Sequence, residues 1–160
     1  MRTTIVTAVV VGAVLIGTTT LQWARAQTGG KMMMKMPSMA EQNAMLKKSI
    51  AAGMKVFSNT SLSTNKTSCA SCHPGGGTVG GKATAMGMQI PIPTLKGAAA
   101  TFPKWKMGAK KVITLAQMNN ACIQVLMKGK PLSISDQRMT DLAAYVTSLS
   151  KGRPVYPQLK

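Results

Sequence analysis

One short motif is the clearest indication of chemistry in this chain. Cys69-Ala70-Ser71-Cys72-His73 is its single CxxCH pattern. This spacing is typical of covalent attachment of a c-type haem, because each thiol can form a thioether with one haem vinyl group. The adjacent histidine then lies beneath the porphyrin as the proximal iron ligand. The motif therefore predicts one haem c, bound through Cys69 and Cys72 and ligated by His73.

The motif does not fix the ligand on the other side of the iron. His73 is the only histidine in the chain, so a second histidine is excluded. A methionine, the third cysteine (Cys122) or an open position remains. Thirteen methionines follow the initiator, and Met107 is the best placed, between the proline-rich segment and the last two expected helices. The next candidates are Met86, Met88 and Met118.

The N-terminus has the organisation of an export signal. Arg2 precedes a nearly unbroken apolar run over 5–15, and an A-x-A cleavage pattern ends at Ala26. The run is shorter than the roughly 20 residues that a membrane-spanning helix needs. We therefore predict a signal peptide over 1–26, a mature protein without a membrane span, and a location in the periplasm or an equivalent extracytoplasmic compartment. An uncleaved anchor is the alternative.

The chain is strongly basic. It has 20 Lys and Arg, only three acidic residues and a net charge of +17; without Arg2 and Arg25, 18 basic residues remain and the net charge is about +15. Such a charge attracts acidic partners and accelerates encounter with them. No nucleic-acid-binding motif is present, and an exported haem protein is not expected to meet nucleic acid. The charge predicts an acidic redox partner.

The part after the leader is about 134 residues long, which is enough for one domain. Residues 27–38 combine glycines with a methionine- and lysine-rich run, and we expect a flexible N-terminal segment there. The haem domain is expected over 39–155, followed by a C-terminal tail over 156–160. The predicted class is an all-α haem domain with long loops.

The first helical pattern begins at Ser38 or Met39 and ends before Ser58. Its apolar residues recur at spacings that place them on one helical face. The residues of that expected inward face are Ala40, Ala44, Met45, Ile50, Met54 and Phe57.

Two further helices are expected at the C-terminal end. One covers about 114–128 and stops before Gly129; the other is capped by Ser133 or Ser135 and ends near Ser150. The expected inward residues of the first are Leu115, Met118, Cys122, Val125 and Leu126. Those of the second are Met139, Leu142, Ala143, Val146 and Leu149.

Two segments between these helices are expected to border the haem. Residues 74–81 contain five glycines and one proline, so that they cannot hold a stable helix and are predicted to form a loop along the haem edge. In residues 90–95 two prolines alternate with isoleucines, and each proline disfavours a helical conformation in the residue before it. This second segment is predicted to be extended and to line the haem pocket.

The last third of the chain resembles known cytochromes. The residues that carry this resemblance are Asn119-Asn120-Ala121-Cys122, Gly129-Lys130-Pro131-Leu132, Ser135, Met139, Leu142-Ala143-Ala144-Tyr145 and Leu149-Ser150-Lys151-Gly152, preceded by Phe102-Pro103-Lys104-Trp105 and Thr114-Leu115. They are similar to the haem domains of the Sox A subunit and of thiosulfate dehydrogenases. In those families the cysteine of this segment ligates the iron, so the resemblance implies that Cys122 is the distal ligand.

A second resemblance concerns the helices. Gly53 and Phe57 resemble the N-terminal helix of class I cytochromes c, which packs across the C-terminal helix, and Tyr145 stands where these proteins often carry an aromatic residue. This resemblance implies a class I-like fold, and the resemblance to the Sox A and thiosulfate dehydrogenase domains covers about residues 44–155.

Two functional interpretations compete. The chain also resembles the small heterodimeric cytochromes of anaerobic ammonium oxidisers, which have His/Cys ligation and bind NO or CO; this implies electron transfer and gas binding, without enzymatic turnover, beside a paralogous cytochrome subunit. The alternative is a sulfur-oxidising cytochrome in which Cys122 carries the substrate sulfur. Residues 123–127 hold no Lys or Arg, and the chain has one CxxCH. Both observations favour the first interpretation. An ordinary His/Met electron carrier is a further alternative.

Overall fold

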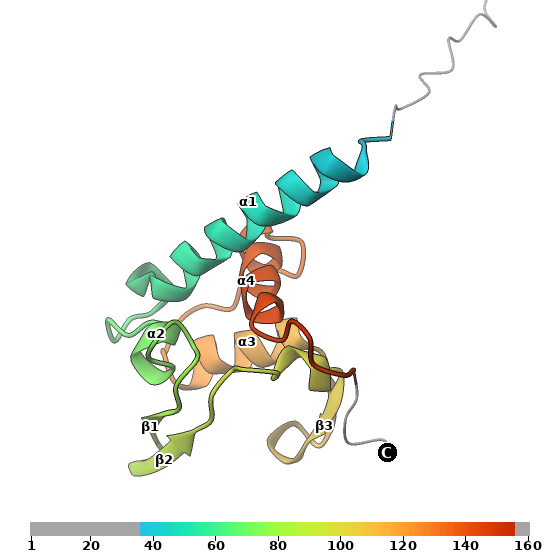
Figure 1. The fold of residues 1–160 in the computed structure, drawn as a ribbon. Coiled ribbons are helices and arrows are strands. Elements are labelled where there is room, and N and C mark those ends of the chain that lie inside the picture. The colour runs from blue at the N-terminus through green and yellow to red at the C-terminus, as the bar shows by residue number, and fades with distance from the viewer. Residues whose placement is uncertain (1–35, 156–160) are drawn as a thin grey trace, which may run out of the picture. The chain divides into compact units, whose positions relative to one another are not determined.

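The structure, a computed structural model, describes residues 36–155. The predicted signal peptide, most of the predicted flexible segment and the predicted tail lie outside these residues. The described helices are α1 (Met39–Ser58), α2 (Cys69–Cys72), α3 (Leu115–Val125) and α4 (Gln137–Ser148) (Figure 1). Short 3-10 helices cover Thr60–Leu62, Ala99–Thr101 and Met107–Ala109. None of the helices in this part of the chain is long and apolar enough to cross a membrane.

Helix α1 begins where the sequence predicts. The Ser38 hydroxyl accepts a hydrogen bond from the Glu41 backbone N–H at 3.3 Å, and the Glu41 carboxylate accepts one from the Ser38 N–H at 2.6 Å. This reciprocal pair satisfies two backbone donors that a helix start leaves without partners. The predicted start at Ser38 or Met39 is confirmed.

Helices α1 and α4 pack across each other (Figure 1). The rings of Phe57 and Tyr145 meet with centroids 5.2 Å apart, and the Ser49 hydroxyl donates to the buried Asp141 carboxylate at 2.6 Å. Gly53 is buried at the crossing, where its lack of a side chain lets the two backbones approach. The predicted contact between the N- and C-terminal helices, with Tyr145 in it, is confirmed.

The core consists of two clusters. One lies at the α1–α4 crossing and contains Phe57, Leu142, Tyr145 and Val146. The other lies under α3 and contains Leu62, Ile123, Met127, Leu132 and Met139. Several expected inward-facing residues are exposed instead, namely Ala40, Ala44, Met45, Met54 and Val125. On α3 the fully buried side chain is Ile123, since the helix faces the core on one side and a cavity on another.

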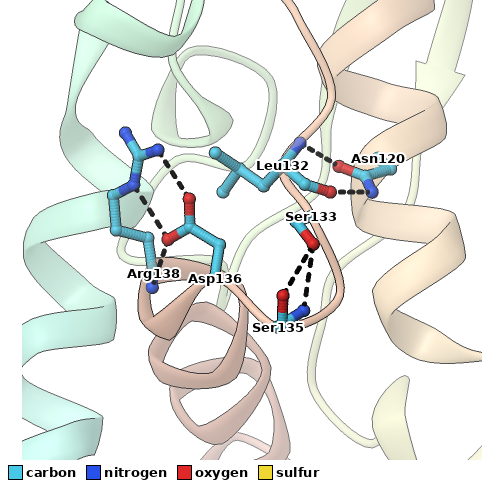
Figure 2. A network of polar contacts seen from close by, with 6 residues as sticks. All are labelled: Asn120, Leu132, Ser133, Ser135, Asp136 and Arg138. Atoms are coloured by element: carbon cyan, nitrogen blue, oxygen red, sulfur yellow. Dashed lines mark hydrogen bonds and ion pairs between the residues drawn. The ribbon is translucent and has the colours of Figure 1, made fainter. Parts of the chain in front are cut away.

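Helix α4 starts later than the sequence predicts. Its N-cap is Asp136, whose carboxylate accepts a hydrogen bond from the Arg138 backbone N–H at 2.9 Å. The same carboxylate forms an ion pair with the Arg138 guanidinium group at 2.6 Å (Figure 2). In the preceding loop the hydroxyl groups of Ser133 and Ser135 form a hydrogen bond with each other at 2.9 Å. The predicted serine cap is therefore wrong, because the aspartate accepts from both the backbone and the arginine.

Two antiparallel hairpins accompany the helices. Strand β1 (Gly81–Ala85) pairs with β2 (Met88–Ile92), and β3 (Lys104–Lys106) pairs with β4 (Lys111–Ile113). The first hairpin includes the first half of the predicted extended segment, residues 90–92, but its pairing with β1 was not predicted. The connecting residues Met86 and Gly87 both have positive φ, as the tight turns of hairpins require. The helices form the frame, and the hairpins are additions within its long loops.

The α1–α4 crossing provides a test of stability. A Cβ at Gly53 would collide with the Asp141 carbonyl oxygen and come within 2.8 Å of the Tyr145 Cβ. We expect Gly53→Ala to lower the free energy of unfolding by roughly 1–3 kcal/mol, as overpacking does. Urea unfolding of the haem-loaded protein measures this. Gly108→Ala is the matched control, since a Cβ there meets nothing within 4 Å. Equal free energies of unfolding for the two variants would contradict the close approach of the α1 and α4 backbones at Gly53.

Candidate haem site

A largely apolar cavity of about 360 Å³ opens next to the CxxCH motif. Its size falls among those of cofactor sites, roughly 300–1,000 Å³. The motif, the extended segment, β3, α3 and α4 all contribute to its walls. The lining residues include Cys69, Cys72, His73, Ile90, Ile92, Pro93, Leu95, Lys104, Lys106, Leu115, Met118, Cys122, Leu142 and Val146. The predicted position of 90–95 against the haem pocket agrees with this lining.

The motif itself forms the one-turn helix α2. The Cys69 carbonyl accepts a hydrogen bond from the His73 N–H at 3.0 Å, which closes the turn and brings both cysteines and the histidine to the cavity wall. The Ser71 hydroxyl accepts from the Ser68 N–H at 3.0 Å and holds the start of the turn. Burial raises the pKa of Cys69 to about 12 and also raises the pKa of Cys72. Both groups therefore face an apolar space as neutral thiols.

His73 has the tautomer that iron ligation needs. Its Nδ1 lies 3.0 Å from the Pro93 carbonyl oxygen, which can only accept, so that Nδ1 carries the proton. Nε2 is then left with a free lone pair. Burial lowers the pKa of His73, while the bond to Pro93 opposes that shift. A neutral imidazole, oriented by a backbone carbonyl, is the usual arrangement of a metal-ligating histidine.

This donor set fits a haem c. Two thiols on one helical turn, an adjacent imidazole with its Nε2 free, and apolar walls are what a covalently attached porphyrin requires. Cys69 and Cys72 would hold the macrocycle, and His73 would ligate the iron.

Cys122 comes to the same cavity from α3, fifty residues further along the chain. Its pKa is raised, chiefly by burial and less by the nearby Cys72, while Lys106 opposes the shift. Of the four methionine candidates, Met118 alone lines the cavity. Met107 is 84% exposed in the turn between β3 and β4, and Met86 and Met88 are exposed in the other hairpin.

Two cavity residues were not expected from the sequence. Lys104 and Lys106 are two positions apart on β3, so that both face the cavity. The Lys104 ammonium group donates to the Thr101 hydroxyl at 2.9 Å and lies 4.5 Å from the centre of the Phe102 ring. Lys106 acts electrostatically on Cys122. Residues 123–127 hold no Lys or Arg, but a basic residue from a strand, Lys106, lines the same cavity as Cys122.

Comparisons with known proteins identify the family of the chain. The model of the family described as SoxA/TsdA, cytochrome c domain, matches residues 52–155. The chain belongs to this family. It is 30% identical over 116 residues to a thiosulfate dehydrogenase of Allochromatium vinosum, covering 69% of this chain and 40% of that protein.

Solved structures share the fold of this SoxA/TsdA-type domain. SoxXA from P. pantotrophus superposes with a TM-score of 0.53 at 20% identity, over 68% of this chain and 35% of that one. Thiosulfate dehydrogenase TsdBA from Marichromatium purpuratum superposes with a TM-score of 0.53 at 18% sequence identity. The match covers 70% of this chain and 24% of that one. The chain thus spans less than half the length of each of these relatives. The predicted helical, class I-like cytochrome c fold and the covalent haem c are confirmed.

A polar clasp holds α3 of the SoxA/TsdA-type domain in place (Figure 2). The Asn120 amide nitrogen donates to the Leu132 carbonyl at 2.8 Å, and the Leu132 N–H donates to the Asn120 amide oxygen at 2.9 Å. One side chain thus satisfies both backbone groups of a loop residue. Because Asn120 precedes Cys122 by two residues, the clasp also fixes the part of α3 that faces the cavity.

The clasp can be tested by removing its side chain. Asn120→Ala leaves a partly buried N–H and carbonyl without partners, and we expect the free energy of unfolding to fall by roughly 1–3 kcal/mol. Urea unfolding followed by circular dichroism measures the loss. Gln124→Ala, an exposed change on the same helix, is the control and should alter stability little. Equal losses in both variants would show that the clasp adds no stability.

Proposed function

We propose that this domain is an exported monohaem cytochrome that oxidises a thiosulfate-type sulfur compound, with His73 and Cys122 as the axial iron ligands. The observation that carries the proposal is that Cys122 and Lys106 both line the cavity beside His73. This pair can bind a sulfur anion, because the ammonium group of Lys106 would hold the negative charge while the outer sulfur of the anion contacts the thiol of Cys122. The relatives named for thiosulfate oxidation support the same substrate class.

The residues divide the work by their chemistry. Haem c, when bound, supplies one-electron redox chemistry. Lys106 is placed to hold the anion, and Lys104, tied to Thr101, adds positive charge to the same wall. To react, Cys122 would first leave the iron. Joining its thiolate to the outer sulfur of one thiosulfate would form one S–S bond and release two electrons, which an external acceptor would take up. A second thiosulfate would then displace the first from Cys122 as tetrathionate and restore the thiolate. The apolar walls strengthen these charge interactions by keeping water out.

Export and a protein partner belong to the proposal. The leader pattern that ends at Ala26 supports an extracytoplasmic location. The structural relatives are named as the two-component cytochromes SoxXA and TsdBA, which supports a second cytochrome subunit beside this chain. Neither the cavity nor the comparisons favour NO or CO binding, so the sulfur interpretation replaces the gas-binding one.

The distal ligand can be identified by spectroscopy. A thiolate favours ferric iron, so we expect a low reduction potential and a near-infrared thiolate-to-iron charge-transfer band in the ferric protein. Cys122→Met should remove that band and raise the potential, because a thioether ligand favours ferrous iron. Met118→Leu is the control and should leave the spectrum unchanged. A methionine band in the wild type that persists in Cys122→Ala would identify an ordinary His/Met cytochrome.

Turnover tests the role of the cavity cation. With thiosulfate as substrate and ferricyanide as acceptor, Lys106→Met should lower kcat/KM about tenfold or more, since a charge-assisted hydrogen bond contributes roughly 1.5–3 kcal/mol. Lys106→Arg should restore part of the rate. Lys130→Met, an exposed change outside the cavity, should have no effect. Turnover that is unaffected by Lys106→Met or by Cys122→Ala would refute the proposed site.

A further inference from the structure

The β3–β4 hairpin has two chemically different faces. Its register pairs Lys104 with Ile113 and Trp105 with Val112. Since side chains alternate along a strand, the lysines of β3 turn to the cavity and Trp105 turns away. Directly paired residues share a face, so Val112 lies beside Trp105 on the outside.

The outer face exposes a large apolar pair. Trp105 is 61% exposed and Val112 is 60% exposed, and Met107 in the connecting turn is exposed still further. Trp105 is the only tryptophan after the predicted leader. Tryptophan is among the residues that contribute most to protein–protein binding energy, and a contiguous exposed apolar cluster marks an interaction site.

The surroundings of this pair are positively charged. Residues 104–113 hold four lysines: Lys104 and Lys106 face the cavity, Lys111 pairs with Lys106 on that same face, and Lys110 is exposed in the connecting turn. No acidic residue occurs between Glu41 and Asp136, and within the part of the chain that the structure describes the ion pair found is Arg138–Asp136, which lies elsewhere. An exposed apolar centre on a strongly basic chain is complementary to a partner that has an apolar patch within an acidic face.

We propose that the outer face of the β3–β4 hairpin, with Trp105 and Val112 at its centre, is the docking surface for an acidic electron-acceptor protein. The inference rests on the redox role proposed above, and it names the partner of the same site. The strand that carries Trp105 also forms the cavity wall through Lys104 and Lys106. A partner seated there is therefore separated from the cavity by a single strand, which suits electron transfer better than a contact on α1.

The hairpin's basic and aromatic character could also suit an anionic membrane surface. A lipid surface does not accept electrons, however, and the other face of this hairpin lines the haem cavity. The position of the hairpin therefore favours a redox protein. Anionic vesicles serve below as the competing probe.

The test uses the haem-loaded protein reduced with dithionite, so that it does not depend on sulfur turnover. The probe is an acidic monohaem cytochrome c as acceptor, with reduction followed by stopped flow and binding by calorimetry. We expect Trp105→Ala to weaken binding about tenfold or more, as loss of a central tryptophan does. Ile134→Ala, an exposed apolar change between α3 and α4, is the matched control and should have no effect.

Charge provides the second pair of variants. Lys110→Gln, in the exposed turn of the hairpin, should slow association with the acidic cytochrome more than Lys130→Gln does, and the difference should shrink as salt rises. Reduction of ferricyanide should be the same in every variant, which separates docking from damage to the haem site.

Three results would overturn the proposal. The first is the absence of saturable binding of the acidic cytochrome to the wild type. The second is equal binding by Trp105→Ala and Ile134→Ala. The third is Trp105-dependent binding to phosphatidylglycerol vesicles without binding to the acidic cytochrome. Because dithionite supplies the electrons, failure of thiosulfate oxidation would leave these measurements intact.

Discussion

The close crossing of α1 and α4 is the contact on which the haem site depends. Gly53 lets the backbone of α1 approach Asp141, and this approach places Phe57 between two partners. One is Tyr145 on α4; the other is His73, whose ring centroid lies 6.5 Å away. Tyr145 in turn donates its hydroxyl proton to the Gly76 carbonyl at 2.8 Å. The crossing thereby holds both the candidate iron ligand and the glycine-rich loop after it.

The cavity combines apolar walls with an unbalanced charge. Burying a cation is costly unless a polar or anionic group compensates. Lys104 is compensated by the Thr101 hydroxyl and the Phe102 ring, whereas Lys106 acts on Cys122. No acidic side chain lines this cavity in the described part of the chain. The haem propionates or a bound sulfur anion would supply this charge, whereas a neutral gas would not.

The β3–β4 hairpin connects the two proposed functions of the domain. Its inner face presents ammonium groups to the cavity, and its outer face presents an indole and a valine to solvent. A two-stranded hairpin keeps these faces apart by the alternation of its side chains alone. The same ten residues can therefore contribute to substrate binding on one side and to partner binding on the other.

The sequence by itself determined the features that depend on neighbouring residues. The CxxCH motif predicts the haem, and helical periodicity locates the start of α1 and the positions of α3 and α4 to within a few residues. The resemblance of the last third pointed to the family. These predictions succeed because thioether attachment, capping and amphipathicity all act over a few positions.

Only the tertiary structure decided what surrounds Cys122. The following helical turn holds no Lys or Arg, and the cavity receives Lys106 instead, from a strand sixteen residues earlier in the chain. The strands themselves were missed, since three-residue strands show too little alternation to be distinguished from loops. Met107, a plausible ligand by position along the chain, lies outside the cavity. Which distant side chains share a cavity depends on how helices and hairpins pack, and that packing is set by contacts that local periodicity does not encode.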